Sequence, residues 1–373
     1  MKKVLLVATV RSHICQFHKP LVSLLHEYGY EVHVAAHDNL AVKNGLKLDF
    51  VEKVYELPFE RSPFSPSNLK AKKELKKIID EGDYEVVHCN TPVGGIMTRL
   101  AAKSARKKGT KVFYTAHGFH FYKGASKKNW IIYYPIEKHF AKLTDKLITI
   151  TKEDYKLAQE KFKTNVVYMH GVGANNEKYQ PVSLEEKSKL RAEQGFSNDE
   201  IIFLCTGELN ANKNQSTVID AFEIVNRKYP NTRLLLAGNG PTDEMLKEKV
   251  KEKNLEDKIN MLGYRTDLEI FTELCDIVVS ASFREGMPLN IMEGMICSKP
   301  LVASNNRGHR ELIVNGETGY IVDAKDANAF AEKMEEFILD EDKRIAFGKR
   351  GAEVIRPWCM DSIKEELKEI YEL

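Results

Sequence analysis

The chain has 373 residues, of which 43% are hydrophobic and 29% charged, a composition typical of soluble globular proteins with room for two domains. No stretch approaches the roughly 18 consecutive apolar residues that a membrane-spanning helix requires. Six cysteines are scattered without a Cys-x-x-Cys pair. This argues against a structural zinc site and fits the reduced core cysteines of a cytosolic protein.

Charge is unevenly distributed along the chain. The net formal charge is +2, yet residues 1–172 carry 29 Lys and Arg against 17 Asp and Glu, while residues 173–373 carry 27 against 37. The basic first half favours contact with an anionic surface, with a solvated lysine-rich surface as the alternative. Lipid and nucleic acid both fit this charge, but no nucleic-acid-binding motif is present, so we expect no nucleic-acid partner.

The N-terminal region alternates strands and helices. Residues 3–9 and 31–35 have the apolar pattern of buried parallel strands, and residues 20–28 between them that of a helix. This alternation predicts an open parallel sheet, in which ligands bind beyond the carboxyl ends of the strands. Ser12 and His13 follow the first strand and are candidates for contact with an acceptor substrate. An ordinary strand-end loop is the alternative.

Residues 68–80 form a basic amphipathic pattern. Leu69, Leu75, Ile78 and Ile79 are expected to share one apolar stripe, with lysines around it. Such a helix either lies on an anionic membrane surface or packs its stripe on the protein core. The sequence leaves both alternatives open.

A polar segment follows the strand predicted at residues 111–116. It carries His117, His120 and Lys123. A strand-end histidine with a near-neutral pKa exchanges hydrogen bonds readily with sugar hydroxyls, so His117 is a candidate site residue. His120 and Lys123 are further candidates, for contact with the acceptor. A structural loop histidine is the alternative.

The glycine-rich segment 169–175 predicts a hinge, after which strand–helix alternation resumes. The apolar residues 199–206 lead to Gly207 and Lys213. Phosphate groups are well met by Lys as a point charge, so Lys213 is a candidate for binding a phosphorylated ligand. A solvated lysine is the alternative.

The most informative stretch contains Glu285 and Glu293 with seven residues between them. Gly286 allows close approach of the backbone to a ligand, and Pro288 suits the first position of a helix predicted over residues 289–297. The free N–H groups at such a helix start bind anions. Two carboxylates beside an anion site suit a nucleotide-sugar, whose hydroxyls flank a diphosphate. A surface strand–turn–helix without a ligand is the alternative.

This stretch resembles the signature of the retaining glycosyltransferases of family 4, in the form Glu285-Gly-Met-Pro-Leu with Glu293. The resemblance extends over nearly the whole chain. The segment around His117, Thr-Ala-His-Gly-Phe-His-Phe-Tyr-Lys-Gly, is similar to that of a subgroup that builds capsular and exopolysaccharides on a lipid carrier.

The resemblance implies an α/β protein of the GT-B fold, with two Rossmann-like parallel-sheet domains facing across a cleft. Residues 1–172 would form the domain on the acceptor and membrane side, with a C-terminal helix at about 358–373 packing back on it. Residues 173–357 would form the domain that binds the nucleotide-sugar.

The resemblance also implies roles for individual residues. In the family the first glutamate approaches the donor sugar, the second binds ribose hydroxyls, and the N–H groups of the turn hold the diphosphate. The catalytic residues implied are His117, Glu285 and Lys213. The donor-binding residues implied are Gly207, Lys213, Gly263, Tyr264, Arg265, Glu285, Gly286, Met287, Pro288, Leu289, Asn290 and Glu293.

One position departs from the family pattern. Glu208 stands where an arginine that holds the diphosphate is common, so the charge is reversed. We therefore expect Lys213 to neutralise more of the diphosphate charge, with help from Arg284, Arg307 or Arg310.

The function implied is transfer of a hexose, with N-acetylhexosamine as the best match to the subgroup, from a UDP-sugar to a saccharide on polyprenyl diphosphate. The enzyme would be cytoplasmic or peripheral on the inner membrane face. No Asp-x-Asp motif occurs at a suitable place, so we expect no metal and no cofactor. A UDP-sugar epimerase or phosphorylase on the same fold, and a catalytically degenerate UDP-sugar-binding protein, are the alternatives.

Overall fold

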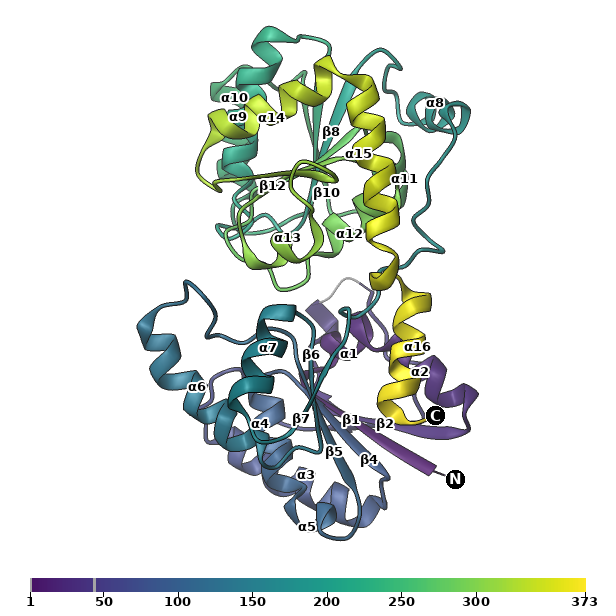
Figure 1. The fold of residues 1–373 in the computed structure, drawn as a ribbon, viewed down its shortest axis with the longest axis vertical. Coiled ribbons are helices and arrows are strands. Elements are labelled where there is room, and N and C mark those ends of the chain that lie inside the picture. Colours follow the sequence, from purple (N-terminus) through teal and green to yellow (C-terminus); the bar gives the residue numbers. More distant parts are fainter. Residues whose placement is uncertain (1, 43–44) are drawn as a thin grey trace. The chain divides into compact units, whose positions relative to one another are not determined.

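The computed structural model describes residues 2–42 and 45–373, which form two compact units (Figure 1). Unit 1 comprises the chain up to Gly173 together with Met360–Leu373, and unit 2 comprises Ala174–Cys359. Each unit is a Rossmann-like parallel sheet covered by helices, as expected. None of the helices within the described residues has the length and apolar character needed to cross a membrane.

The described part of unit 1 contains a seven-stranded parallel sheet in the order β3-β2-β1-β4-β5-β6-β7. Its strands are β1 (Lys2–Val10), β2 (Tyr30–His37), β3 (Lys53–Glu56), β4 (Val86–Asn90), β5 (Lys111–Ala116), β6 (Lys146–Thr149) and β7 (Asn165–Tyr168). Its helices are α1 (Arg11–Phe17), α2 (Lys19–Glu27), η1 (Leu40–Val42), α3 (Ser67–Gly82), α4 (Pro92–Ala101), α5 (Lys103–Arg106), α6 (Lys127–Ala141), α7 (Lys152–Lys161) and α16 (Met360–Tyr371).

Unit 2 contains a six-stranded parallel sheet in the order β10-β9-β8-β11-β12-β13 among the residues described. Its strands are β8 (Ile201–Thr206), β9 (Thr232–Ala237), β10 (Ile259–Gly263), β11 (Ile277–Ser280), β12 (Leu301–Ser304) and β13 (Gly319–Val322). Its helices are α8 (Leu184–Glu193), α9 (Gln215–Lys228), α10 (Asp243–Glu252), α11 (Leu268–Leu274), α12 (Leu289–Ile296), α13 (Arg307–Leu312), α14 (Ala327–Leu339), α15 (Glu341–Val354) and η2 (Arg356–Trp358).

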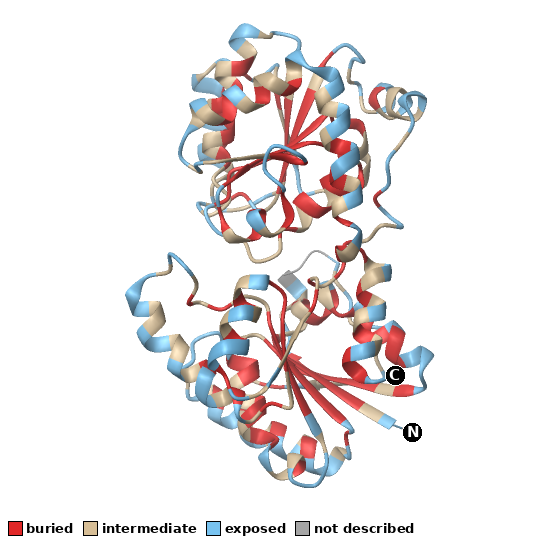
Figure 2. Cartoon of the chain, viewed as in Figure 1, coloured by how far each residue is buried: buried red, intermediate tan, exposed pale blue. Residues whose placement is uncertain are grey.

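The central strands of both sheets are apolar throughout because helices cover both of their faces. Figure 2 shows this burial along the strands, while the outer faces of the helices are exposed. In β1, the run from Val4 to Ala8 is fully buried, as is Leu234 to Leu236 in β9. Burial of such runs, at about 25 cal/mol per Å² of apolar surface, is the main stabilisation of each unit.

Strand order reverses once in each sheet. In unit 1 the reversal lies between β1 and β4, and in unit 2 between β8 and β11. The loops that leave two such neighbouring strands diverge to opposite faces of the sheet, which opens a crevice at the carboxyl ends where ligands bind in α/β proteins. The residues that follow these four strands are therefore the first place to look for a site.

Three expectations about local structure need correction. The segment after β1 is not a loop, because α1 begins at Arg11, directly after the strand, and buries Ile14 and Cys15. Leu69 does not belong to the apolar stripe of α3, since 62% of its surface is exposed. Pro288 is not the first helical residue, because its ψ of 104° is extended and makes it the N-cap of α12.

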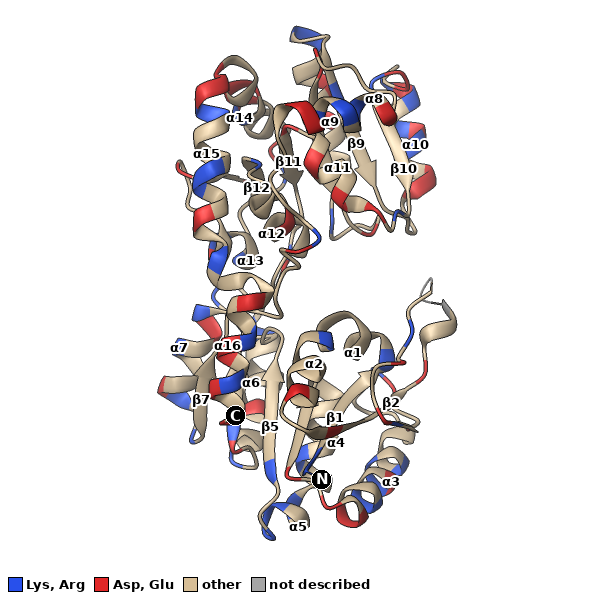
Figure 3. Cartoon of the chain, turned by 90° about the vertical axis from the view of Figure 1, so that its right-hand side faces the viewer, with Lys and Arg blue, Asp and Glu red and all other residues tan. Residues whose placement is uncertain are grey.

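The buried stripe of α3 consists of Asn68, Ala71, Leu75 and Ile79, and it packs in the core of unit 1. Because this stripe is already buried, the helix presents mainly its charged face to solvent. Figure 3 shows that acidic and basic residues alternate along this helix. This arrangement favours the second alternative for residues 68–80, a surface helix packed on the core.

The C-terminal helix α16 belongs to unit 1, although it follows the last helix of unit 2 in sequence. The Tyr371 hydroxyl lies 2.6 Å from Nδ1 of His88 in β4, and the Lys146 ammonium donates to the carbonyl oxygen of Ile370 at 2.5 Å. Ile363 and Leu367 of the same helix are buried. These contacts tie the end of the chain to the sheet of unit 1.

Candidate functional site

The candidate site of unit 2 lies where its strand order reverses. Lys213 follows β8 and Glu285 follows β11, and the Lys213 ammonium donates to Oε1 of Glu285 at 2.6 Å. Only 23% of the lysine side chain and 13% of the glutamate side chain are exposed. The structure therefore brings together two of the three residues predicted to be catalytic.

Hydrogen bonds to backbone carbonyl oxygens hold the loop after β8, which carries Lys213, against the loop after β11, which carries Glu285. The Phe283 N–H donates to the carbonyl oxygen of Asn212 at 2.8 Å, and the Asn212 side chain donates back to the carbonyl oxygen of Arg284 at 3.0 Å. Asn214 has a left-handed backbone (φ 54°) and donates to the carbonyl oxygen of Ala281. Asparagine tolerates this conformation better than most residues, so the sequence Asn-Lys-Asn suits the loop that presents Lys213.

Glycines let neighbouring loops touch through their backbones. Gly238 has a φ of 147°, and a Cβ added there would lie 1.9 Å from the carbonyl oxygen of Gly207. A Cβ on Gly308 would lie 2.7 Å from the carbonyl oxygen of Gly286 and 2.8 Å from Cβ of Glu285. Gly308 thus allows α13 to pack directly behind the loop that carries Glu285.

The second glutamate of the motif, Glu293, is a partly buried residue of α12. Burial raises its pKa to about 7, although a hydrogen bond from Tyr179 and the charge of Lys178 act in the opposite direction. Burial disfavours the charged form of a carboxyl group. Near neutral pH this group is therefore divided between an acceptor-only carboxylate and a protonated form that also donates.

His309, in α13, is a site residue that the sequence analysis did not single out. Its side chain is fully buried, and its Nδ1 lies 2.7 Å from the carbonyl oxygen of Ser304 and donates to it. Nε2 is buried without a hydrogen-bond partner in the described part of the protein. Burial lowers the pKa of His309 to about 4, and both Glu285 and Lys213 act on it electrostatically. A neutral imidazole with a free acceptor therefore borders the Lys213–Glu285 pair.

The other predicted donor-binding residues differ in whether their side chains already bind a neighbouring group of the protein. Tyr264 is 52% exposed, whereas the Arg265 guanidinium is paired with Asp267 at 2.5 Å. The Asn290 side chain donates to the carbonyl oxygen of Thr206, so it anchors α12 to β8. Glu208 is exposed and accepts a hydrogen bond from Asn210.

The remaining members of the predicted donor set are backbone positions and apolar side chains. Gly263, with φ 66°, ends β10, and its carbonyl oxygen accepts from the Gly238 N–H at 2.8 Å. Met287 and Leu289 are partly buried and pack against the core of unit 2. Of the auxiliary arginines, Arg284 is exposed, and Arg310 donates to the side chain of Asn305.

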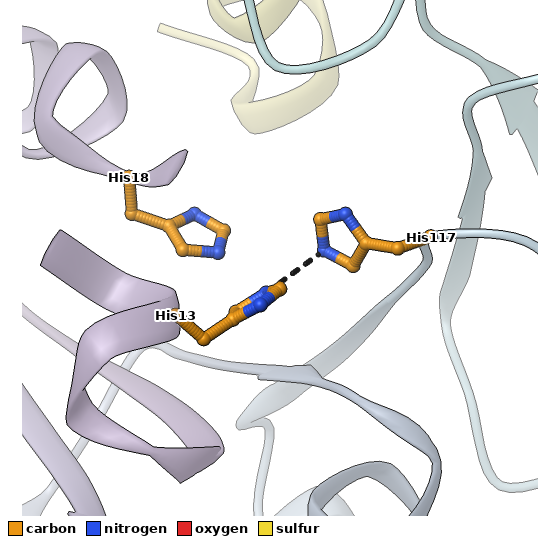
Figure 4. Close-up of side chains that lie close together, drawn as sticks. All are labelled: His13, His18 and His117. Carbon is orange, nitrogen blue, oxygen red and sulfur yellow. Dashed lines mark hydrogen bonds between the residues drawn. The ribbon is translucent and has the colours of Figure 1, made fainter. Parts of the chain in front are cut away.

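Unit 1 has its own polar cluster at the corresponding edge of its sheet. His13 follows β1, and its Nε2 lies 3.1 Å from Nε2 of His117, which follows β5. The His117 Nε2 also lies 3.0 Å from the side-chain oxygen of Asn90, the last residue of β4. His18 joins this group from the junction between α1 and α2 (Figure 4).

These histidines are neutral at physiological pH. Burial lowers the pKa of His117 to about 4 and that of His88 to about 3. Burial and repulsion among the rings hold the pKa values of His13 and His18 well below their usual range. Neutral imidazole has one nitrogen that accepts and one that donates, so the cluster is suited to hydroxyl groups.

Three predicted acceptor-side residues lie outside this cluster. Ser12 is buried and exchanges two hydrogen bonds with Asn39. His120 stacks on Tyr133 of α6 at a ring distance of 4.6 Å, and Lys123 is exposed on the segment leading to that helix. Of the four residues predicted on the acceptor side, the structure places His13 beside His117.

Comparison with known proteins agrees with this architecture. Residues 186–354 match the family described as glycosyl transferases group 1, and residues 3–151 match the family described as glycosyl transferase 4-like. The chain is 40% identical over 99% of its length to the putative glycosyltransferase EpsD of Bacillus subtilis (strain 168), covering 96% of that protein.

More distant relatives have more specific names. An Escherichia coli UDP-Gal:alpha-D-GlcNAc-diphosphoundecaprenol alpha-1,3-galactosyltransferase is 25% identical, with 82% of this chain and 79% of that protein covered. The capsular polysaccharide biosynthesis glycosyltransferase CapM of Staphylococcus aureus is 23% identical, with 94% and 92% covered. The crystal structure of Anabaena Alr3699/HepE in complex with UDP and glucose superposes with a TM-score of 0.78 at 20% identity, with both chains fully covered.

Two parallel-sheet units with a Lys–Glu pair at the sheet edge define an enzyme of the GT-B class, and the matches identify it as a glycosyltransferase that transfers a hexose. The chain belongs to glycosyltransferase family 4, in the group that includes exopolysaccharide and capsule enzymes.

Proposed function

We propose that this protein is a retaining glycosyltransferase that moves a sugar from a UDP-sugar to a saccharide carried on a polyprenyl diphosphate. The observation that carries this proposal is the Lys213–Glu285 pair, held at 2.6 Å beside the start of α12. Support for the nucleotide comes from the UDP bound in the Anabaena protein of the same fold. Support for the acceptor comes from the name of the Escherichia coli relative.

In the proposed reaction, the bond between the anomeric carbon and the β-phosphate oxygen breaks, and UDP leaves with the bonding electrons. Negative charge then develops on the β-phosphate, where the Lys213 ammonium and the N–H groups at the start of α12 stabilise it. Glu285 orients the lysine and faces the sugar, which acquires positive character. The acceptor hydroxyl attacks the same face, and its proton passes to the leaving phosphate.

The other residues have positioning roles in this proposal. Glu293 accepts hydrogen bonds from the ribose hydroxyls, the exposed ring of Tyr264 stacks on the base, and His117 binds a hydroxyl of the donor sugar. His13 binds the acceptor. No step requires a metal ion on the diphosphate, since Lys213 and the helix start supply the positive charge.

The donor sugar and the location follow from weaker observations. N-acetylhexosamine is proposed as the sugar from the resemblance of the His117 segment to one subgroup. Peripheral attachment to the inner membrane face is proposed from the charge of unit 1, which has 31 Lys and Arg against 22 Asp and Glu. A lipid-linked acceptor would reach the enzyme at such a surface.

The test is UDP release from a panel of UDP- and GDP-sugars, with and without a lipid-linked acceptor. Wild type, Glu285→Ala and the control Glu256→Ala are compared, because Glu256 is an exposed residue of the same unit. Release from one UDP-sugar that rises with acceptor and is lost only in Glu285→Ala supports the proposal. The anomeric configuration of the product, read by NMR, separates retention from inversion.

Other results would identify the alternatives. Isomerisation of the sugar without transfer would indicate an epimerase. UDP binding by calorimetry with no release from any donor would indicate a degenerate binding protein, a consequence consistent with the charge reversal at Glu208.

A further inference from the structure

Helix α6 of unit 1 has an exposed face that carries lysines and apolar side chains. The opposite side of the helix packs on the core of unit 1 through Trp130, Tyr133, Tyr134 and Ala141. The exposed positions, including the C-cap residue, are Lys127, Lys128, Ile131, Ile132, Pro135, Lys138, His139 and Lys142. Exposed and partly exposed residues therefore predominate along this helix (Figure 2).

The exposed residues form one row along the helix. Lys127, Ile131, Pro135, Lys138 and Lys142 follow one another at spacings of three or four residues, which places their side chains on the same side. Lysines lie at both ends of this row and the apolar residues lie between them. The most exposed apolar side chain is that of Ile131, of which 75% is exposed.

The lysines of this face have no carboxylate partner among the residues described. The single acidic residue of α6, Glu137, is buried and accepts a hydrogen bond from the Arg99 guanidinium at 3.0 Å. The Lys138 ammonium donates to the Tyr134 hydroxyl at 3.4 Å, which leaves its charge uncompensated. The face therefore carries four positive charges that the protein itself does not neutralise.

Helix α3, the other lysine-rich helix of unit 1, differs in this respect. Three of its five lysines are paired with acidic residues four positions further along the helix. These ion pairs are Lys70–Glu74, Lys76–Asp80 and Lys77–Glu81. Pairing of opposite charges leaves little net field, so α6 is the better of the two helices for attracting an anionic partner.

The chemistry of the α6 face matches an anionic lipid bilayer. Lysines are attracted to acidic headgroups, and an aliphatic side chain between them gains by entering the apolar boundary. A single exposed isoleucine is ordinary on a protein surface, but here it lies within a row of uncompensated lysines. Trp130 and Tyr133 of the same helix are partly exposed aromatic residues, a type enriched at membrane interfaces.

We propose that the exposed face of α6 docks on an anionic lipid bilayer, with its lysines at the headgroups and Ile131 inserted between them. This inference rests on the peripheral attachment included in the proposed function, which came from the overall charge of unit 1, and it assigns the contact to one helix. The helix begins ten residues after His117, in the unit that we propose binds the lipid-linked acceptor.

The test is flotation of full-length protein with vesicles made of equal parts of phosphatidylglycerol and phosphatidylcholine, or of phosphatidylcholine alone. Wild type should bind the anionic vesicles. Lys127→Gln/Lys128→Gln/Lys138→Gln should bind about 100-fold more weakly, because each lysine near an anionic surface contributes about fivefold. Ile131→Ser should weaken binding about tenfold, because less apolar surface enters the bilayer.

The matched control removes the same charge from α3. Lys70→Gln/Lys76→Gln/Lys77→Gln should bind nearly as wild type does, because charges more than about 8 Å from the headgroups are screened at physiological salt. An equal loss of binding in the α3 and α6 variants would overturn the assignment to α6. Wild-type binding that does not depend on phosphatidylglycerol, or that is absent with both vesicles, would overturn the proposal as a whole.

A second measurement needs no substitution. Of the two tryptophans in the chain, Trp130 lies in α6 and is partly exposed, while Trp358 in unit 2 is only 5% exposed. Brominated lipids in the anionic vesicles should therefore quench the emission of Trp130, and vesicle-bound protein without quenching would show that another surface docks. Both measurements use protein without donor or acceptor, so their outcome and that of the UDP-release test are independent.

Discussion

Units 1 and 2 carry polar clusters at equivalent places, yet the two clusters differ in charge. In unit 2 the reversal of strand order presents an ion pair, Lys213 with Glu285. In unit 1 the reversal between β1 and β4, together with the neighbouring end of β5, presents neutral histidines and an asparagine. A doubly charged diphosphate needs a cation, whereas a sugar hydroxyl is well served by neutral imidazole. The shared architecture fixes where each site lies, and the side chains fix what it binds.

Among the predictions that test the different roles of the two units, the largest expected effect is the loss of UDP release on substitution of Lys213. Lys213→Ala should lower UDP release about 100- to 1000-fold, because it removes the charge that stabilises the leaving phosphate and leaves Glu285 unpaired. The matched control is Lys251→Ala, at an exposed lysine of α10. An equal loss of UDP release in both variants, or full kcat in Lys213→Ala, would contradict the role of the Lys213 charge in stabilising the leaving phosphate.

The pH dependence of stability should differ between wild type and Glu293→Gln. The folded pKa of Glu293, about 7, lies above the ordinary value of about 4.3 for the unfolded chain. Between these pH values the folded state keeps a proton that the unfolded state has released. The free energy of unfolding therefore falls as pH rises through this window, by about 3–4 kcal/mol in total.

Urea unfolding at pH 5 and pH 8 measures this effect. Relative to wild type, Glu293→Gln should be more stable at pH 8 by about that amount. Glu256→Gln serves as the control for an exposed carboxyl group. A pH dependence that is identical in wild type and Glu293→Gln would mean that Glu293 ionises normally in the folded protein.

Gly308→Ala tests how tightly unit 2 holds Glu285. The new methyl group would lie 2.7 Å from the carbonyl oxygen of Gly286, so the loop must shift. A displacement of about 1 Å can cost about 100-fold in rate, and we expect UDP release to fall about 10- to 100-fold while the protein stays folded.

Gly351→Ala is the control for that substitution, since the nearest atoms there belong to Met295 at 3.7 Å or more. It lies within α15, where alanine favours the helix by up to about 1 kcal/mol over glycine. Unchanged UDP release in Gly308→Ala would show that the loop accommodates the methyl group.

The smallest effect is expected at the contact between α16 and unit 1. Tyr371→Phe removes the hydrogen bond to His88 and should lower the free energy of unfolding by about 1–2 kcal/mol, because the buried imidazole nitrogen loses its partner. Tyr28→Phe, at a tyrosine that is 47% exposed, should be neutral. Equal stability of both variants in urea unfolding would argue that this bond contributes little.

The two sites also differ in how far the sequence predicted them. Glu285 and Glu293 lie within one short motif, and Lys213 follows a clear strand. Short stretches of sequence were therefore enough to predict the site residues of unit 2. The histidine cluster was not predicted in this way, although His13 and His117 were each singled out, because nothing in the chain indicates that residues 104 positions apart meet. One signal in the sequence could have pointed to His18: it lies five residues after His13, in the segment that follows the first strand.

The sequence by itself determined the fold class and the family, because hydrophobic periodicity and a contiguous motif are local properties of the chain. The resemblance also implied a C-terminal helix at about 358–373, where the structure has α16 (Met360–Tyr371). Only the tertiary structure decided that Arg265 is paired with Asp267, that Asn290 anchors a helix, and that His309 lies buried beside Glu285. It also placed Leu69 in solvent and Ser12 against Asn39. Such outcomes depend on which side chains from distant segments compete for the same partner, and packing alone settles that competition.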